Sequence, residues 1–385
     1  MKVTNYNPNI LTWAAARADK DMSQLQNYFP KIEGWLDKSY APTLKQLEGF
    51  AKMVYLPFGY LFLPEPPRDD LPITFFRTGL TKNDELPLSL IHTVQTLKER
   101  QEWLKDFLEV NEFKPLDFVG NFSHESSEQE VIQDMYKVLG IQQNWFREIK
   151  TLDEILVFLI DKIESVGVMV SMSGTVNGNT HRPISREEFR GFALVDDQAP
   201  FLFVNSNDSK SAQIFTLIHE LAHIWIGASA GTDMFQLLPA NDPVEIFCNK
   251  VAAEFLVPAE LFLEQWKQTR NFSELRTYFK VSEMVVARKA YDLGVISKDA
   301  YIEHYRTSME AWKLFKEKQK ESTGGSYYYT TRRRVGMQFT RYVDSAVKQD
   351  KLLYRDALDL GFEELAVQMV KDARDEGYLI TWEQK

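Results

Sequence analysis

The sequence predicts an α+β protein that is mainly helical and contains one small antiparallel sheet. Over most of the chain, apolar residues recur at three- and four-residue steps, which is the helical period. Residues 167–176, 189–196 and 200–206 are instead rich in valine and phenylalanine and are bounded by Gly, Asn, Asp and Pro, as strands are. Helical spacing returns directly afterwards, at residues 209–227 and 242–258. A small sheet flanked by helices is an α+β arrangement.

The overall composition is that of a multidomain globular protein. The chain has 385 residues, which indicates two to four domains, and 44% of them are hydrophobic, which is enough for packed cores. The net charge of −10 argues against a nucleic-acid surface spread over the whole molecule, although a local basic patch remains compatible with it.

Several features indicate a cytoplasmic protein. Cys248 is the single cysteine, so no internal disulfide can form, which fits a reducing compartment. The first residues lack the apolar core and cleavage site of a signal peptide, and no apolar run approaches 18 residues. We therefore expect no membrane span.

The N-terminal 63 residues have the spacing of short helices joined by very short links. Thr43 is placed to cap one of them, with Gln46 three residues later to complete a capping box. The proline-rich acidic run at 64–72 cannot be helical and indicates a domain boundary.

The composition of the chain also indicates how the rest of it divides into domains, with a Gly- and Tyr-rich segment typical of a linker at 322–334. The expected domains are an N-terminal helical domain (1–66), a helical connecting region (67–150), a domain that holds the sheet (151–262) and a C-terminal helical region (263–385).

The stretch "FTLIHELAHIW" carries the chemistry. His219 and His223 are four residues apart, so on a helix they lie one turn apart on one face and can bind one metal ion. Glu220 follows His219 and is close enough to act as a base on a water molecule that zinc has acidified. Asp208 or Ser209 can cap this helix, and Gly227 can end it. The alternative is a core helix with two satisfied histidines, which the spacing makes the less favoured interpretation.

A hydrolytic zinc site usually has three protein ligands and one open position. The next helix offers Glu245, which shares a face with Asn249, and Asp242 and Pro243 form a typical start of that helix. Glu254 and Asp233 are the competing candidates. A solvated carboxylate is the alternative role for each of them, but the helix context favours Glu245 as the third ligand.

Other reactive residues are less informative. Cys248 is three residues after Glu245, slightly off its face, and is expected to be a buried, inert thiol. His181 and Arg182 lie in a connection between two predicted strands and could stabilise an oxyanion, but a solvated turn is preferred. The segment with Arg332, Arg333, Arg334 and Arg341 beside Tyr327, Tyr328 and Tyr329 could bind nucleic acid, although a linker and a solvated helix face are slightly preferred.

The run from "THRPISREEFRGF" through "IHELAHIWIG" to "EIFCNKVAAEFLVP" resembles the ImmA/IrrE family of metallo-endopeptidases, most strongly over residues 165–260. The resemblance implies a zincin-like peptidase domain with His219 and His223 as zinc ligands, Glu220 as the base and Glu245 as the third ligand. Cys248 stands where alanine is usual in the family.

The N-terminal region resembles the XRE-type helix-turn-helix domain that often precedes this peptidase domain, and the C-terminal segment is similar to the tail of longer members. Seven basic and five acidic residues leave a net charge of only +2 over residues 1–63, which is weak for phosphate binding. DNA binding and protein contacts are therefore about equally favoured for this domain.

Two functions are compatible with these features. The first is a zinc-dependent endopeptidase whose target is a repressor or antitoxin protein. The second is a DNA-binding antitoxin or regulator that binds a toxin partner, with the zinc domain as a scaffold. A retained Glu220 favours the peptidase, because a purely structural site has no use for a base.

Overall fold

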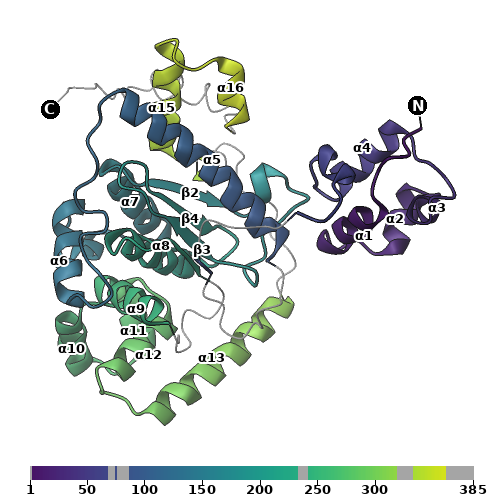
Figure 1. Cartoon of the computed structure of the whole chain (residues 1–385). Helices are drawn as coiled ribbons and strands as arrows, with labels where there is room; N and C mark the ends of the chain where they lie inside the picture. The colour runs from purple at the N-terminus through teal and green to yellow at the C-terminus, as the bar shows by residue number, and fades with distance from the viewer. Residues whose placement is uncertain (1, 68–73, 76–85, 233–241, 319–332, 361–385) are drawn as a thin grey trace. The chain divides into compact units, whose positions relative to one another are not determined.

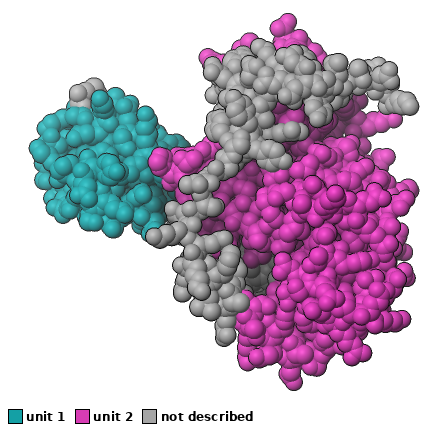
Figure 2. All heavy atoms as spheres, turned by 180° about the vertical axis from the view of Figure 1, so that it is seen from behind, with its two compact units in different colours: residues 1–72, 85–92 teal, residues 73–84, 93–385 magenta. Residues whose placement is uncertain are grey.

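The computed structural model describes residues 2–67, 74–75, 86–232, 242–318 and 333–360 (Figure 1). The chain divides into two compact units: unit 1 comprises residues 1–72 and 85–92, and unit 2 comprises residues 73–84 and 93–385 (Figure 2). Each unit is described by itself. The predicted domain boundaries remain predictions.

Unit 1 is built from short helices around its own core. The elements are α1 (Pro8–Arg17), α2 (Met22–Tyr28), α3 (Ile32–Leu36), α4 (Leu44–Met53) and the 3-10 helix η1 (Phe58–Phe62). Trp35 and Phe50 are fully buried and contact Phe29. The predicted capping box at Thr43 and Gln46 is confirmed, because each side chain accepts a hydrogen bond from the other residue's backbone N–H.

Unit 2 surrounds a mixed sheet. Its strands within the described residues are β1 (Thr74–Phe75), β2 (Met169–Ser173), β3 (Gly191–Leu194), β4 (Phe201–Asn205) and β5 (Ala230–Thr232), in the order β1-β5-β3-β4-β2. β3 is antiparallel to β4 and β5, whereas β2 runs parallel to β4 and β1 runs parallel to β5.

The predicted antiparallel sheet is therefore wrong in its topology, although strands occur in all three predicted segments. The reason is that β2 does not pair with β3, its neighbour in sequence. β4 lies between them, and the connection at 174–190 crosses over so that β2 and β4 point the same way. The apolar pattern of a strand indicates which residues are buried, but not which strand lies beside it.

Both faces of this sheet are covered, since every residue of β2, β3 and β4 is buried. Val170 and Leu202 belong to a core shared with α7 (Leu152–Ser165) and α8 (Lys210–Trp225). On the opposite side, Phe201 contacts Phe339 of α15 (Met337–Lys348), and α5 (Leu88–Val110) crosses the sheet (Figure 1).

The other helices of unit 2 pack around this centre. They are α6 (Glu128–Leu139), η2 (Trp145–Glu148), η3 (Val176–Gly178), α9 (Pro243–Leu256), α10 (Ala259–Gln268), α11 (Phe272–Phe279), α12 (Glu283–Asp292), α13 (Lys298–Lys318) and α16 (Tyr354–Asp359). No helix in the described ranges has the length and apolar character needed to cross a membrane.

Candidate metal centre

Helix α8 presents the two histidines from the middle of unit 2. Of its two predicted caps, Ser209 occupies the N-cap and its hydroxyl accepts from the backbone N–H of Ala212. The helix ends before Gly227, whose φ of +70° favours glycine and confirms the predicted stop. Gly227 lies against the backbone of Gly120, so a side chain there would also collide. Every side chain from Gln213 to Trp225 is buried.

Helix α9 presents the carboxylate. The predicted cap is confirmed, because the Asp242 side chain accepts from the backbone N–H groups of Val244 and Glu245 at 2.8 and 3.4 Å, with Pro243 in the first turn. Glu245 therefore lies in the first turn of α9. It is 6% exposed, and α9 packs closely on α8.

The three side chains converge. The Nε2 atoms of His219 and His223 are 3.1 Å apart, and they lie 3.2 and 3.3 Å from the two carboxylate oxygens of Glu245. Both histidines are fully buried. Of the residues the structure describes, these three are the group whose donor atoms could hold a metal ion.

The electrostatics of this cluster depend on burial and on proximity. Burial lowers the pKa of His219, but the adjacent Glu245 carboxylate outweighs it and the net shift is upward. Burial prevails at His223, whose pKa is lowered. Burial also works against ionisation of Glu245, yet the two histidines bring its pKa down to about 2. The cluster thus offers a carboxylate and at least one neutral imidazole lone pair.

This donor set fits a divalent cation. Three acceptors directed at one point repel each other unless a cation or protons lie between them. Two imidazole nitrogens and one carboxylate are ligands that Zn²⁺ prefers, whereas Ca²⁺ and Mg²⁺ prefer sites made of oxygen.

Glu220 is fully buried on α8 and lies next to β3. A Cβ atom built on Gly191 would be 3.1 Å from Glu220 Oε1 and 2.5 Å from the Thr216 side chain. The bare backbone of Gly191 therefore makes the space in which Glu220 lies. The sequence analysis did not identify Gly191 as part of the site. A glycine inside an apolar strand is nevertheless a known sign that another group packs closely against the strand backbone.

The other candidates lie elsewhere. Glu254 does not join the histidines: its carboxylate accepts from the backbone N–H of Ala259 and pairs with Lys289. Cys248 is buried and burial raises its pKa well above the ordinary value, which matches an inert thiol. Asp233 lies outside the described residues.

The remaining polar candidates belong to loops and to the C-terminal region. His181 and Arg182 lie in the connection that follows η3, where the backbone N–H of His181 donates to Asn179. Arg341 donates to Gln338 on α15. The backbone carbonyl of Arg334 accepts from Ser171 of β2, which ties this segment to the sheet. Arg332 and Tyr327, Tyr328 and Tyr329 lie outside the described residues.

A buried His-His-Glu cluster on two adjoining helices defines a candidate metal-binding protein. Residues 164–291 match the model of a family described as Peptidase_M78, the IrrE N-terminal-like domain. This match supports the resemblance to the ImmA/IrrE family over that part of the chain and points to a metallopeptidase-type hydrolase. No curated protein and no solved structure matched the chain.

Proposed function

We propose that this protein is a zinc-dependent endopeptidase. The observation that carries the proposal is the convergence of His219, His223 and Glu245 within hydrogen-bonding distance of one another, with Glu220 on the same helix. The family match over residues 164–291 supports the same reaction class.

Each residue then has a defined role. His219, His223 and Glu245 would hold the ion through two Nε2 atoms and a carboxylate. Zinc bound there would supply a Lewis acid that acidifies water and polarises the scissile carbonyl. Glu220 would accept the proton from the attacking water and pass it to the leaving amine. Glu220 is fully buried, so bulk water would not compete for its carboxylate.

We further propose that the target is a regulatory protein, of the repressor or antitoxin type. The resemblance to the ImmA/IrrE family motivates this, and the burial of the whole cluster supports it. His219, Glu220 and His223 are 0% exposed among the described residues, and such restricted access fits an enzyme with few substrates.

A second function rests on a separate observation. Unit 1 has its own core and its own capped helices, as an independent binding module would. We propose as the alternative that the chain is a DNA-binding antitoxin or regulator that holds a toxin partner. Co-purification with a neighbouring gene product that survives Glu220→Gln, and a shift of its own promoter DNA at low salt, would favour this alternative.

The experiment uses the full chain loaded with zinc, together with Glu220→Gln and the surface control Glu260→Gln. Each protein is incubated with candidate repressor and antitoxin proteins, and cleavage is followed by mass spectrometry. We expect Glu220→Gln to bind one metal ion per chain and to cut roughly 10²–10⁴-fold more slowly, since that is the usual size of a general-base contribution. Glu260→Gln should cut at the normal rate. Equal cleavage by wild type and Glu220→Gln, or none by either, contradicts the proposal.

A further inference from the structure

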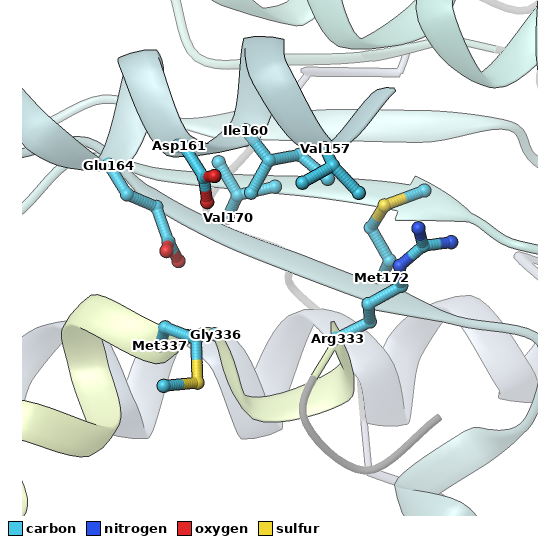
Figure 3. Close-up of a pocket in the computed structure, with 9 residues that line it drawn as sticks. All are labelled: Val157, Ile160, Asp161, Glu164, Val170, Met172, Arg333, Gly336 and Met337. Carbon is cyan, nitrogen blue, oxygen red and sulfur yellow. The ribbon is translucent and has the colours of Figure 1, made fainter. Parts of the chain in front are cut away.

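A second polar pocket lies away from the metal centre, between α7, β2 and the start of α15. It encloses about 520 Å³ of open space, part of it continuous with solvent. Figure 3 shows side chains from all three elements around it, with Glu164 and Asp161 directed into the space from α7. The cavity itself has a volume of about 80 Å³, which is room for a few water-sized groups and so for a very small ligand.

Glu164 forms the inner end of this pocket. It is 5% exposed, and its Oε1 atom has no hydrogen-bond partner among the described residues. Buried carboxylate oxygens are nearly always paired, so an unpaired one on a residue that lines a pocket indicates an absent partner. The pairing atom has to be a donor, because a carboxylate only accepts.

Gly336 lies close against this oxygen. A Cβ atom there would be 3.0 Å from Glu164 Oε1 and 2.7 Å from the carbonyl oxygen of Val170. The φ of Gly336 is +86°, a conformation that favours glycine. A side chain at this position would therefore press on both Glu164 and the backbone of β2.

The other residues that line the pocket form an acidic end, an apolar wall and a basic end. Asp161, one turn before Glu164, is an exposed carboxylate on the same side of α7. Val157, Ile160 and Met172 form an apolar wall between these acids and the guanidinium of Arg333, which lies at the opposite end (Figure 3). Two carboxyl groups against a short apolar wall are complementary to a cation with an aliphatic tail.

The pKa of Glu164 also indicates that a positive charge is missing beside its carboxylate. Burial raises its pKa to about 7, and the charge of Asp161 adds to that, while Arg341 and a backbone N–H of Gln338 oppose it. The protein's own groups thus leave this carboxyl poorly compensated. A bound ammonium would supply the missing charge.

We propose that this pocket is a binding site for a small aliphatic ammonium ion, with the ammonium group held by Glu164 and Asp161 and the alkyl chain against Val157, Ile160 and Met172. The site shares no residue with the His-His-Glu cluster. It is built on the edge strand β2, which is separated by β4 from β3, the strand beside Glu220, so it does not depend on the proposed peptidase function.

The test is isothermal titration of the full chain with n-pentylamine and with n-pentanol, which have the same alkyl chain. At pH 8 the amine carries a proton, because its pKa is near that of lysine. We expect saturable binding of one pentylamine per chain, at least about tenfold tighter than that of pentanol, as a charge-assisted hydrogen bond requires. Equal affinities for the two probes, or no saturable binding of the amine, overturn the proposal.

Variants then locate the site. Glu164→Gln should weaken pentylamine binding at least about tenfold, and Glu109→Gln, an exposed change of the same charge on α5, should leave it unchanged. Val157→Phe retains Glu164 and Asp161 but fills the pocket. It therefore tests whether the amine binds in this pocket if Glu164→Gln does not fold. Undiminished binding by folded Glu164→Gln or by Val157→Phe shows that the amine binds elsewhere and rejects the site.

Discussion

Glu220 of α8 lies directly against the backbone of Gly191 in β3. A Cβ atom on Gly191 would approach Glu220 Oε1 to 3.1 Å, and it would meet the Thr216 side chain at 2.5 Å and the carbonyl oxygen of Phe203 at 2.7 Å. The position of the proposed base is therefore set by a glycine in the sheet, and not only by its own helix.

The first prediction concerns this contact. Gly191→Ala should displace α8 from β3, lower the free energy of unfolding by about 1–3 kcal/mol, as overpacking does, and slow peptide cleavage. Metal binding should persist, because the groups nearest to the new Cβ atom are Thr216, Phe203 and Glu220, and not the three proposed ligands. Chemical denaturation and metal analysis measure both effects. Gly59→Ala is the control, since a Cβ atom there meets nothing within 4 Å; equal losses in the two variants would count against the assigned contact.

The second prediction concerns the carboxylate ligand. Glu245→Gln should weaken zinc binding by more than about 100-fold, because it replaces a charged ligand with a neutral one, and even outer partners of metal ligands contribute 10–100-fold. Competition with a chromogenic chelator gives the dissociation constant. Glu260→Gln, an exposed change on α10, is the matched control. Wild-type affinity in Glu245→Gln would remove this residue from the metal centre.

The third prediction concerns the buried pair of Glu254 on α9 and Lys289 on α12. Their side chains are 12% and 7% exposed, so Lys289→Met leaves a desolvated carboxylate and should cost about 3–5 kcal/mol of stability. Lys250→Met breaks the solvated pair with Glu128 and should cost less than about 1 kcal/mol. Urea denaturation compares them. Similar losses of stability in Lys289→Met and Lys250→Met would show that burial does not determine how much each ion pair contributes to stability.

The fourth prediction is a pH dependence. Burial raises the pKa of Glu164 from 4.5 to about 7, so the folded chain keeps this proton where the unfolded chain releases it. Its contribution to stability is complete below pH 4.5 and is lost as pH rises to about 7, a total of about 3 kcal/mol. Glu164→Gln should remove that part of the decline. Unfolding midpoints at pH 5 and pH 8 test this, and parallel declines in both proteins would exclude Glu164 as the cause.

Much of the local structure follows from the sequence, because its signals act over a few residues. The capping box at Thr43, the start of α9 at Asp242 and the stop of α8 at Gly227 each depend on neighbours within one helical turn. The spacing of His219 and His223 likewise places both rings on one face wherever that helix lies. Such features are visible before any tertiary contact is known.

Contacts between distant segments could not be predicted in this way. The place of β4 between β2 and β3 depends on which edges meet, and apolar alternation does not encode that choice. Gly191 beside Glu220, and Gly336 beside Glu164, join residues whose separation in sequence hides their proximity. The association of Glu245 with the histidines was predicted from helix context, while Glu254, another glutamate on the same helix, pairs with Lys289 instead.

The first turn of α9 has one more consequence. The two histidines lower the pKa of Glu245 to about 2, and Glu245 sits where the helix dipole favours negative charge, beside the Asp242 cap. The negative charge at the helix start is thus stabilised by the chain's own groups, which hold the proposed ligand beside the two histidines. Loading and loss of the metal would then proceed on a preorganised scaffold, with exchange limited by access rather than by refolding.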